Sequence, residues 1–274
     1  MNPALWRKAL SDAWLQLVIS SVLLLLFSWL FVWLMSLFKI GAWSVLLNLM
    51  PDFFRPMLGV PIAKLATPIG QLSILYVHVI TMLVCVGWAV GRGSDPISGE
   101  IARGTMDLIL SLPIRRASLL VPSAVVSAAG AAVLAGCVWL GTAVGLLLVD
   151  LGPGVAMAQL LPGAVNLCAM TFCITGITTL ISSLGSDRWR TILFTIGFFI
   201  ISLIIEMVGR LWPAGAWLKY FSILAAFQPQ QLILLPDETT LTALKYNATL
   251  LGAGLLCYVA AAIALSRRDI PAAR

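Results

Sequence analysis

The chain has 274 residues, of which 61% are hydrophobic and only 10% are charged, and its mean hydropathy is +1.03. A soluble domain carries roughly 25% charged residues, so this much apolar surface cannot be hidden in one water-facing core. The composition therefore excludes a soluble enzyme with a single anchor and predicts a polytopic membrane protein. The net charge of +6 gives no support for nucleic-acid binding, because no run of basic residues exceeds two.

Six charge-poor stretches are long enough to cross a membrane as helices. A spanning helix needs about 20 predominantly apolar residues, and these continuous apolar runs exclude a β-barrel, whose strands alternate. We expect an all-α fold in a single transmembrane domain, residues 1–274. Its six predicted spans are Ala13–Phe38, Leu65–Gly91, Ala117–Val149, from Gln159 or Gly163 to Ser186, Thr191–Gly209 and Tyr246–Ser266.

The distribution of Lys and Arg indicates that both termini are cytoplasmic. With the N-terminus inside, 11 of the 17 basic residues fall on the inner side, and the others lie in longer outer loops, which count for less. We expect the protein in a cell membrane, as in the inner membrane of a bacterium. The first apolar run is too long for a signal peptide and lacks a small-residue cleavage site, so no cleavable leader is expected.

The first twelve residues, 1–12, are expected to form an interfacial helix. Asn2 followed by Pro3 is typical of a helix start. The apolar and the charged residues after Pro3 separate onto opposite faces, as in helices that lie on a membrane surface. The alternative is a first span that simply begins early.

The outer segment 210–245 is expected to form a helical hairpin that re-enters the outer leaflet. Its apolar run Phe221–Pro236 is too short to cross and is broken at Gln228–Pro229. Non-helical backbone at such a depth must pack on protein or line a wet cavity, so we expect the hairpin to pack on the bundle. Trp212, Trp217 and Tyr220 are expected at the outer membrane interface.

The segment 92–118, between the second and third spans, is the most informative part of the chain. Asp95 followed by Pro96 is typical of a helix start, and Pro113 is expected to end that helix. Glu100 and Arg103 are spaced to pair on it, as are Arg103 and Asp107. A helix this short is marginal in water, so it needs a surface against which to pack its apolar stripe of Ile97, Ile101, Leu108 and Leu112.

One motif in this segment resembles a known family. Gly99-Glu100-x-x-Arg103-Gly104-Thr105, followed by Leu110-Ser111-x-Pro113-Ile114, is similar to the first cytoplasmic loop of six-helix permease subunits of type-2 ATP-binding-cassette (ABC) exporters. In that family the segment is a coupling helix that docks on a cytosolic ATPase. The six spans, the interfacial helix and the outer hairpin also fit the resemblance. One difference is Val121-Pro122, where relatives often have a Lys.

The resemblance implies a permease subunit that pairs with a second permease, either another copy or a paralogue. Separate ATPase subunits would bind ATP and Mg and drive the export of a cargo, and the apolar spans favour a hydrophobic or amphipathic one. This chain has no G-x-x-x-x-G-K-[ST] loop, so it is expected to be no enzyme and to hold no cofactor. The implied ATPase-coupling residues are Ile97, Glu100, Ile101, Arg103, Gly104, Thr105, Leu108, Leu112 and Pro113.

Three titratable residues inside the spans, His78, Glu206 and Arg210, are candidate pathway or gate residues. The competing interpretations are structural. A neutral His78 would hydrogen-bond to a neighbouring helix, and Glu206 would pair with Arg210 four residues later. Glu100 could likewise be half of a surface ion pair, worth ~0–1 kcal/mol.

Small residues recur at four-residue intervals along the third span. This spacing predicts close helix packing, with a pore lining as the alternative. The residues are Ser123, Ser127, Ala131, Ala135, Gly141 and Gly145.

Two other function classes are considered. A membrane-embedded enzyme acting on lipid would need clustered polar residues at the interface, and the sequence has no paired carboxylates, HExxH or Ser-His-Asp set at catalytic spacing. An ATP-independent channel or carrier would transport its substrate as the purified chain alone. The single His excludes a His-rich metal site, and five cysteines inside the spans without a CxxC pair give no reason to expect a disulfide or zinc.

Overall fold

The computed structural model describes residues 3–37, 45, 47–51, 55–111, 116–152, 155–235 and 239–267, and every regular element in these ranges is helical. Six helices are long and apolar enough to cross a membrane, which confirms the number of predicted spans and identifies a multi-pass membrane protein. They are α1 (Pro3–Leu37), the run Pro68–Ala102 that contains α6 (Val79–Ser94), α9 (Leu120–Leu148), α10 (Met157–Leu184), α11 (Arg188–Leu211) and α13 (Thr239–Arg267).

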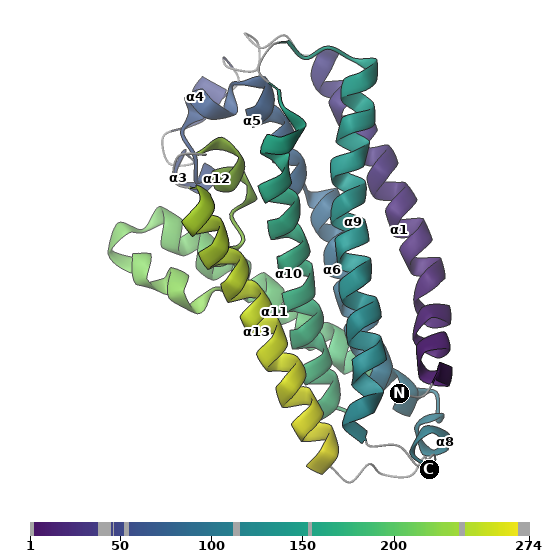
Figure 1. The fold of residues 1–274 in the computed structure, drawn as a ribbon. Coiled ribbons are helices and arrows are strands. Elements are labelled where there is room, and N and C mark those ends of the chain that lie inside the picture. The colour runs from purple at the N-terminus through teal and green to yellow at the C-terminus, as the bar shows by residue number, and fades with distance from the viewer. Residues whose placement is uncertain are drawn as a thin grey trace.

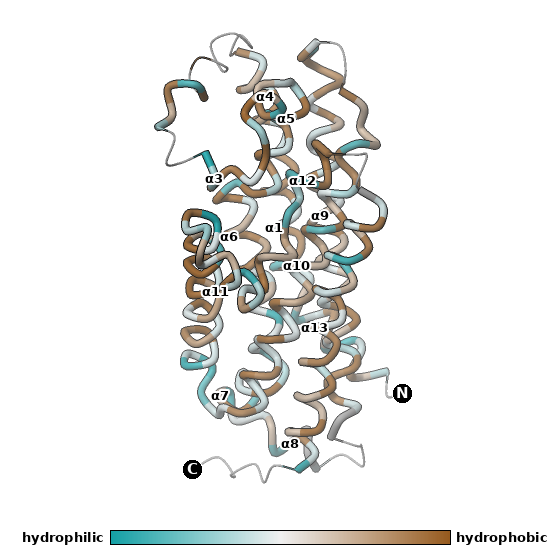
Figure 2. Tube along the Cα trace, turned by 90° about the vertical axis from the view of Figure 1, so that its left-hand side faces the viewer, coloured by the Kyte–Doolittle hydropathy of each residue, from teal (hydrophilic) through white to brown (hydrophobic). Residues whose placement is uncertain are grey.

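Helix α10 forms the centre of the bundle, with α6, α9, α11 and α13 packed around it and α1 packed on α9 (Figure 1). Most residues of α11 and α13 are hydrophobic, and many of these side chains are exposed on the outside of the bundle (Figure 2). The hydroxyls of Thr171, Thr175 and Thr178 in α10 are buried, and each donates to the carbonyl four residues earlier. A polar side chain in a dry core must find such a partner, and these threonines find theirs without leaving their own helix.

The contact between α1 and α9 depends on small residues, as the four-residue spacing predicts. All six small residues of that spacing are buried. A Cβ atom added at Gly141 would lie 2.5 Å from the carbonyl oxygen of Leu25, and one at Gly145 would lie 2.6 Å from Cβ of Val32. The two backbones therefore approach too closely for any side chain at these positions, which confirms close packing.

Helix α1 is continuous from Pro3 to Leu37, so the predicted separate helix over 1–12 is wrong and the early-starting span is right. No Gly or Pro occurs after Pro3 within these residues, so nothing interrupts the helix. Its first turns pack on protein instead of lying alone on the membrane, because Leu5, Ala9 and Ala13 are buried. Asn2, the expected cap, lies outside the described residues.

The predicted second span, Leu65–Gly91, is interrupted at its middle. Helices α4 (Ile62–Leu65) and α5 (Pro68–Ser73) and the 3₁₀ turn η2 (Ile74–Val77) precede His78, and α6 begins after it. His78 has an extended conformation, with φ −63° and ψ 142°. The helix is therefore broken at His78, and a new helix begins at Val79.

Between α11 and α13 the described residues form short helical elements. They are η5 (Pro213–Phe221), η6 (Ile223–Ala226) and α12 (Pro229–Leu234), and α3 (Arg55–Leu58) lies near them. The predicted break at Gln228 and the predicted packing on the bundle are confirmed. Asn166 of α10 accepts a hydrogen bond from the backbone N–H of Gln228 (2.9 Å) and donates one to the carbonyl of Ala226 (3.1 Å).

The close approach of α1 and α9 yields a stability test. Gly141→Leu should destabilise the bundle by about 1–3 kcal/mol, because the new side chain meets backbone of α1 that cannot move aside. Gly136→Leu is the matched control on the same helix, since a Cβ there meets nothing within 4 Å. Thermal unfolding of both purified variants in detergent measures the difference, and equal midpoints would contradict this packing.

Candidate functional site

The segment expected to start a new helix at Asp95 instead continues α6. The chain passes through a π-helical turn, η3 (Asp95–Gly99), and then α7 (Glu100–Ala102). Pro96 has no N–H, and its ring clashes with the carbonyl four residues earlier in an α-helix. The wider π turn accommodates the ring, so Asp95 is not a helix cap and that prediction is wrong.

The continuous helix ends at Gly104. The N–H of Gly104 donates to the carbonyl of Ile101, and the N–H of Thr105 donates to the carbonyl of Glu100. These two bonds form a Schellman ending, which requires a left-handed residue. Gly104 supplies it, with φ +69°. A separate short helix, α8 (Met106–Leu110), comes after this turn.

The turn at Gly104 divides the predicted apolar stripe, so the single helix expected from Asp95 to Pro113 is wrong. Ile97 is fully buried in the bundle and Ile101 is half-buried, whereas Leu108 is 70% exposed at the end of the molecule. Leu112 and Pro113 lie outside the described residues. The segment therefore has a buried base (residues 95–100) and a largely exposed tip (residues 102–108), in which Met106 is buried against Ile97 and its neighbours.

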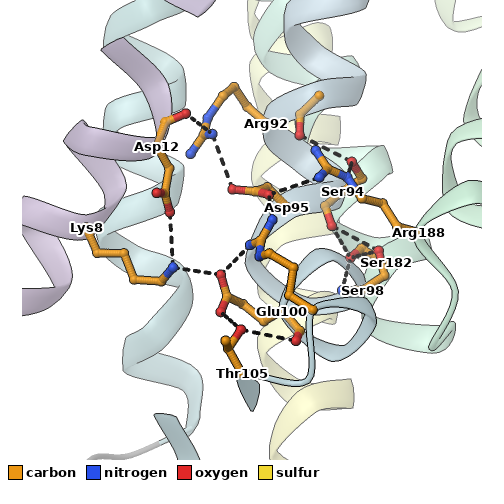
Figure 3. Close-up of polar contacts among 12 residues, drawn as sticks. Lys8, Asp12, Arg92, Ser94, Asp95, Ser98, Glu100, Thr105, Ser182 and Arg188 are labelled. Carbon is orange, nitrogen blue, oxygen red and sulfur yellow. Dashed lines mark hydrogen bonds and ion pairs between the residues drawn. The ribbon is translucent and has the colours of Figure 1, made fainter. Parts of the chain in front are cut away.

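Asp95 is the centre of a buried ionic cluster at the base (Figure 3). Its carboxylate lies 3.3 Å from Arg92 Nη1, 2.9 Å from Arg103 Nη1 and 3.5 Å from Arg188 Nη1. Arg188 is the first residue of α11, and Arg92 also donates to the carbonyl of Asp12 in α1 (3.0 Å). One carboxylate thus joins the end of α6 to the start of α11, while its arginine partner reaches α1.

Glu100 is the second carboxylate of this cluster. Its side chain is only 3% exposed, and it contacts Lys8 Nζ of α1 at 2.8 Å and the guanidinium of Arg103. The hydroxyl of Thr105 donates to its other oxygen (2.6 Å). The Glu100–Arg103 pair is confirmed, but the interpretation of Glu100 as half of an exposed pair is wrong. Glu100 also pairs with Lys8, which is 92 residues away in α1, and its side chain is buried between the two helices.

Arg103 bridges both carboxylates from the edge of the tip. Partial burial lowers the pKa of its guanidinium, but hydrogen bonds to Asp95 and Glu100 outweigh this effect and raise the pKa above its ordinary value. Arg103 therefore stays charged and holds the exposed tip to the buried base.

A serine cluster fixes the base to α10. The backbone N–H of Ser98 donates to Oγ of Ser182 (2.9 Å), and Ser182 Oγ also lies 2.9 Å from Ser98 Oγ and 3.2 Å from the carbonyl of Ser94. Ser98 lies in the π turn, and its N–H is satisfied by Ser182. A free polar backbone group at this burial would otherwise be costly.

Sequence reasoning missed Lys8, Asp95, Ser182 and Arg188 as members of this site. A signal for three of them was present, because each charged residue lies at the end of a predicted span, and charged side chains at such positions tend to pair with one another. Ser182 gave no such signal, since one serine in a helix rich in hydroxyls does not stand out.

Glu206 and Arg210 form the predicted pair, with Arg210 Nε 2.9 Å from Glu206 Oε1. The pair belongs to a larger outer cluster. Arg210 also donates to the carbonyl of Met57 (2.9 Å) and to Oε1 of Gln228 (2.6 Å), and Gln228 Nε2 donates to Glu206 Oε1 (3.1 Å). This cluster ties α11 to the outer segments.

His78 is a helix cap in this structure. Its Nδ1 accepts a hydrogen bond from the N–H of Ile80 (3.2 Å), which satisfies a free donor at the start of α6. Its ring packs on Phe27 and Phe31 of α1, at centroid distances of 4.9 and 5.7 Å. The predicted hydrogen bond to a neighbouring helix is therefore wrong, because the bond closes on its own helix.

No known protein-family model matches this chain, and comparison with curated proteins found no significant match. Within the residues that the structure describes, no group of three or more His, Cys, Asp and Glu side chains is arranged to hold a metal ion. The ionic cluster around Asp95 and Glu100 joins α1, the end of α6 and the start of α11.

The ionic cluster leads to a second stability test. Asp95→Asn should cost about 3 kcal/mol, because it leaves the buried guanidinium of Arg92 without its carboxylate partner. Asp187→Asn is the control: its pair with Arg190 is exposed, and Asn retains the helix cap, so the loss should stay below about 1 kcal/mol. Thermal unfolding compares the two, and equal losses would exclude a central role for Asp95.

Proposed function

We propose that this chain is a permease subunit of an ABC exporter. It pairs with a second permease, a copy of itself or a paralogue, and separate cytosolic ATPase subunits bind ATP and Mg. The chain contributes no catalysis. Its cargo is hydrophobic or amphipathic, in keeping with spans that carry few charges.

The observation that carries the proposal is the exposed tip on a buried base. Gly104 and Leu108 are exposed, and the tip belongs to the segment whose motif resembles the ATPase-docking loop of type-2 exporters. An apolar Leu at 70% exposure gains free energy when a partner covers it. The ionic cluster behind it links the tip to α1, α6 and α11, so a push on the tip reaches three helices.

The position of the tip supports a cytoplasmic partner. The start of α1, the end of α13 and α8 lie at one end of the bundle (Figure 1). The positive-inside rule favours this end as the cytoplasmic one, since it holds Lys8, Arg92, Arg103 and Arg188. ATP binding would then close the ATPase pair, move the tip and shift the bundle between two packed states.

The first test of this function is copurification with an ATPase. Leu108→Asp should weaken the complex at least about tenfold, because it removes apolar burial worth ~1.5–3 kcal/mol and places a carboxylate against an apolar groove. The permease is purified from native membranes and examined for a Walker-motif protein. The bundle should remain folded, since Leu108 is exposed.

Asp107→Asn is the control for this experiment, because it alters the neighbouring exposed residue without removing apolar surface. It should retain the ATPase as wild type does. If wild type and Leu108→Asp retain an ATPase equally, docking through Leu108 is refuted. If wild type brings down none and the purified chain transports alone, the carrier hypothesis replaces the proposal.

The second test concerns topology. A cysteine at Asp107 should resist an impermeant thiol reagent in intact cells, and one at Tyr220, which is 91% exposed at the other end of α11, should react. The unmodified chain, whose native cysteines all lie within helices, gives the background. Labelling at position 107 from outside would reverse the orientation and overturn the coupling role of the tip.

A further inference from the structure

A polar cavity of about 530 Å³ lies at the outer end of α11. Its lining includes Arg55, Glu206, Arg210 and Lys219. Glu206 and Arg210 neutralise each other as a pair. Within the described residues Lys219 forms no ion pair. Its ammonium group therefore gives the cavity a positive charge that suits an anionic group.

Glu206 has a second, unused acceptor in the same place. Oε1 receives hydrogen bonds from Arg210 and Gln228, but Oε2 is buried and has no hydrogen-bond partner among the described residues. Glu206 is only 8% exposed, and such an unsatisfied oxygen is costly. A ligand that fits this cavity should combine an anionic group with a hydrogen-bond donor.

An apolar groove of about 760 Å³ begins at the same two residues. It runs between α6 and α11, and its lining includes Glu206 and Arg210 at one end and Gly91 and Ile192 at the other. Between Val79 and Gly91 helix α6 rises about 18 Å. One leaflet of a bilayer has a hydrocarbon depth of about 15 Å, so the groove is long enough for an extended acyl chain.

The segment that carries Lys219 has exposed aromatic side chains of the kind found at a membrane interface. Lys219 belongs to η5, which projects sideways from the bundle (Figure 1). The side chains of Trp217 and Tyr220 in this segment are 55% and 91% exposed. Exposed Trp and Tyr side chains are typical of the headgroup region of a membrane, so phospholipid headgroups have direct access to Lys219.

We propose that the polar cavity and the apolar groove together bind one phospholipid whose headgroup carries a phosphate and a hydrogen-bond donor. Lys219 attracts the phosphate, the headgroup donor satisfies Glu206 Oε2, and an acyl chain fills the groove. An apolar face of a second permease could cover the groove, but it would leave the cationic cavity uncompensated. This binding is independent of any ATPase.

The experiment is native mass spectrometry of the full chain in detergent, titrated with phosphatidylglycerol or phosphatidylcholine of identical acyl chains. Phosphatidylglycerol has headgroup hydroxyl donors and phosphatidylcholine has none. We expect phosphatidylglycerol to bind at least about tenfold more tightly, because it carries a net negative charge and headgroup donors, whereas phosphatidylcholine is zwitterionic and has no donor. Equal binding of the two lipids would indicate only non-specific surface lipid and would overturn the proposal.

Two variants separate the headgroup from the chain. Lys219→Gln should weaken phosphatidylglycerol binding about tenfold, whereas Lys245→Gln, at an exposed lysine outside the cavity lining, should not. Gly87→Leu should fill the groove and weaken both lipids, because a side chain there meets nothing within 4 Å and Leu favours a helix.

Gly136→Leu, at an equally open helical glycine outside the groove, controls for the added bulk. Unchanged lipid binding in both Lys219→Gln and Gly87→Leu would refute the site. Loss of ATPase copurification in Leu108→Asp with phosphatidylglycerol binding retained would leave the lipid site intact, so the two proposals fail separately.

Discussion

The hydrocarbon core of a membrane offers the backbone no hydrogen bonds, and each interruption of a helix must therefore be satisfied by the protein itself. Among the described residues, three of these interruptions are each satisfied by one side chain from the protein. His78 accepts from Ile80 at the start of α6, Ser182 accepts from Ser98 in the π turn, and Asn166 accepts from Gln228 in the outer segment. Each of these irregular segments therefore lies beside the side chain that accepts its backbone hydrogen bond.

The same constraint governs charge. Each buried carboxylate has an arginine within ion-pair distance, since an isolated charge at this depth would be far too costly. Asp95 and Glu100 are compensated at one end of the bundle, and Glu206 is compensated near the other end of α11. Glu206 nevertheless keeps one oxygen without a partner among the described residues. That incomplete satisfaction distinguishes the outer cluster from a purely structural ion pair.

Composition and local residue spacing were sufficient to predict the spans and the short-range contacts. Six spans, the Glu206–Arg210 pair and the close packing of small residues in α9 all depend on period and length, and the structure confirms them. The break at Gln228 was predicted, but the structure at Asp95 was not, because the same local sequence is compatible with two conformations. Asp95-Pro96 can start a helix or widen one into a π turn, and only the acceptor at Ser182, 84 residues away, decides between them.

The inner cluster needed the same long-range information. Glu100 and Arg103 were spaced to pair, but the burial of Glu100 depends on Lys8, whose helix could equally have lain on the membrane surface. No local pattern reports that α1 runs unbroken to the inner end. The pairing of the neighbours was thus predictable, and the three-helix joint that they form was not.

Helix α11 connects the two polar clusters, and its packing suggests how they would communicate. Few residues of α11 are buried, whereas most residues of α10 are. Few side chains therefore fix α11 to the bundle along its length. Its first residue, Arg188, lies in the inner cluster, and Arg210 near its end lies in the outer one. A helix of 24 residues is a rod of about 36 Å. If an ATPase displaces Asp95, Arg188 must follow or lose its partner, and a rigid α11 carries that displacement to Glu206 and the cavity beside it.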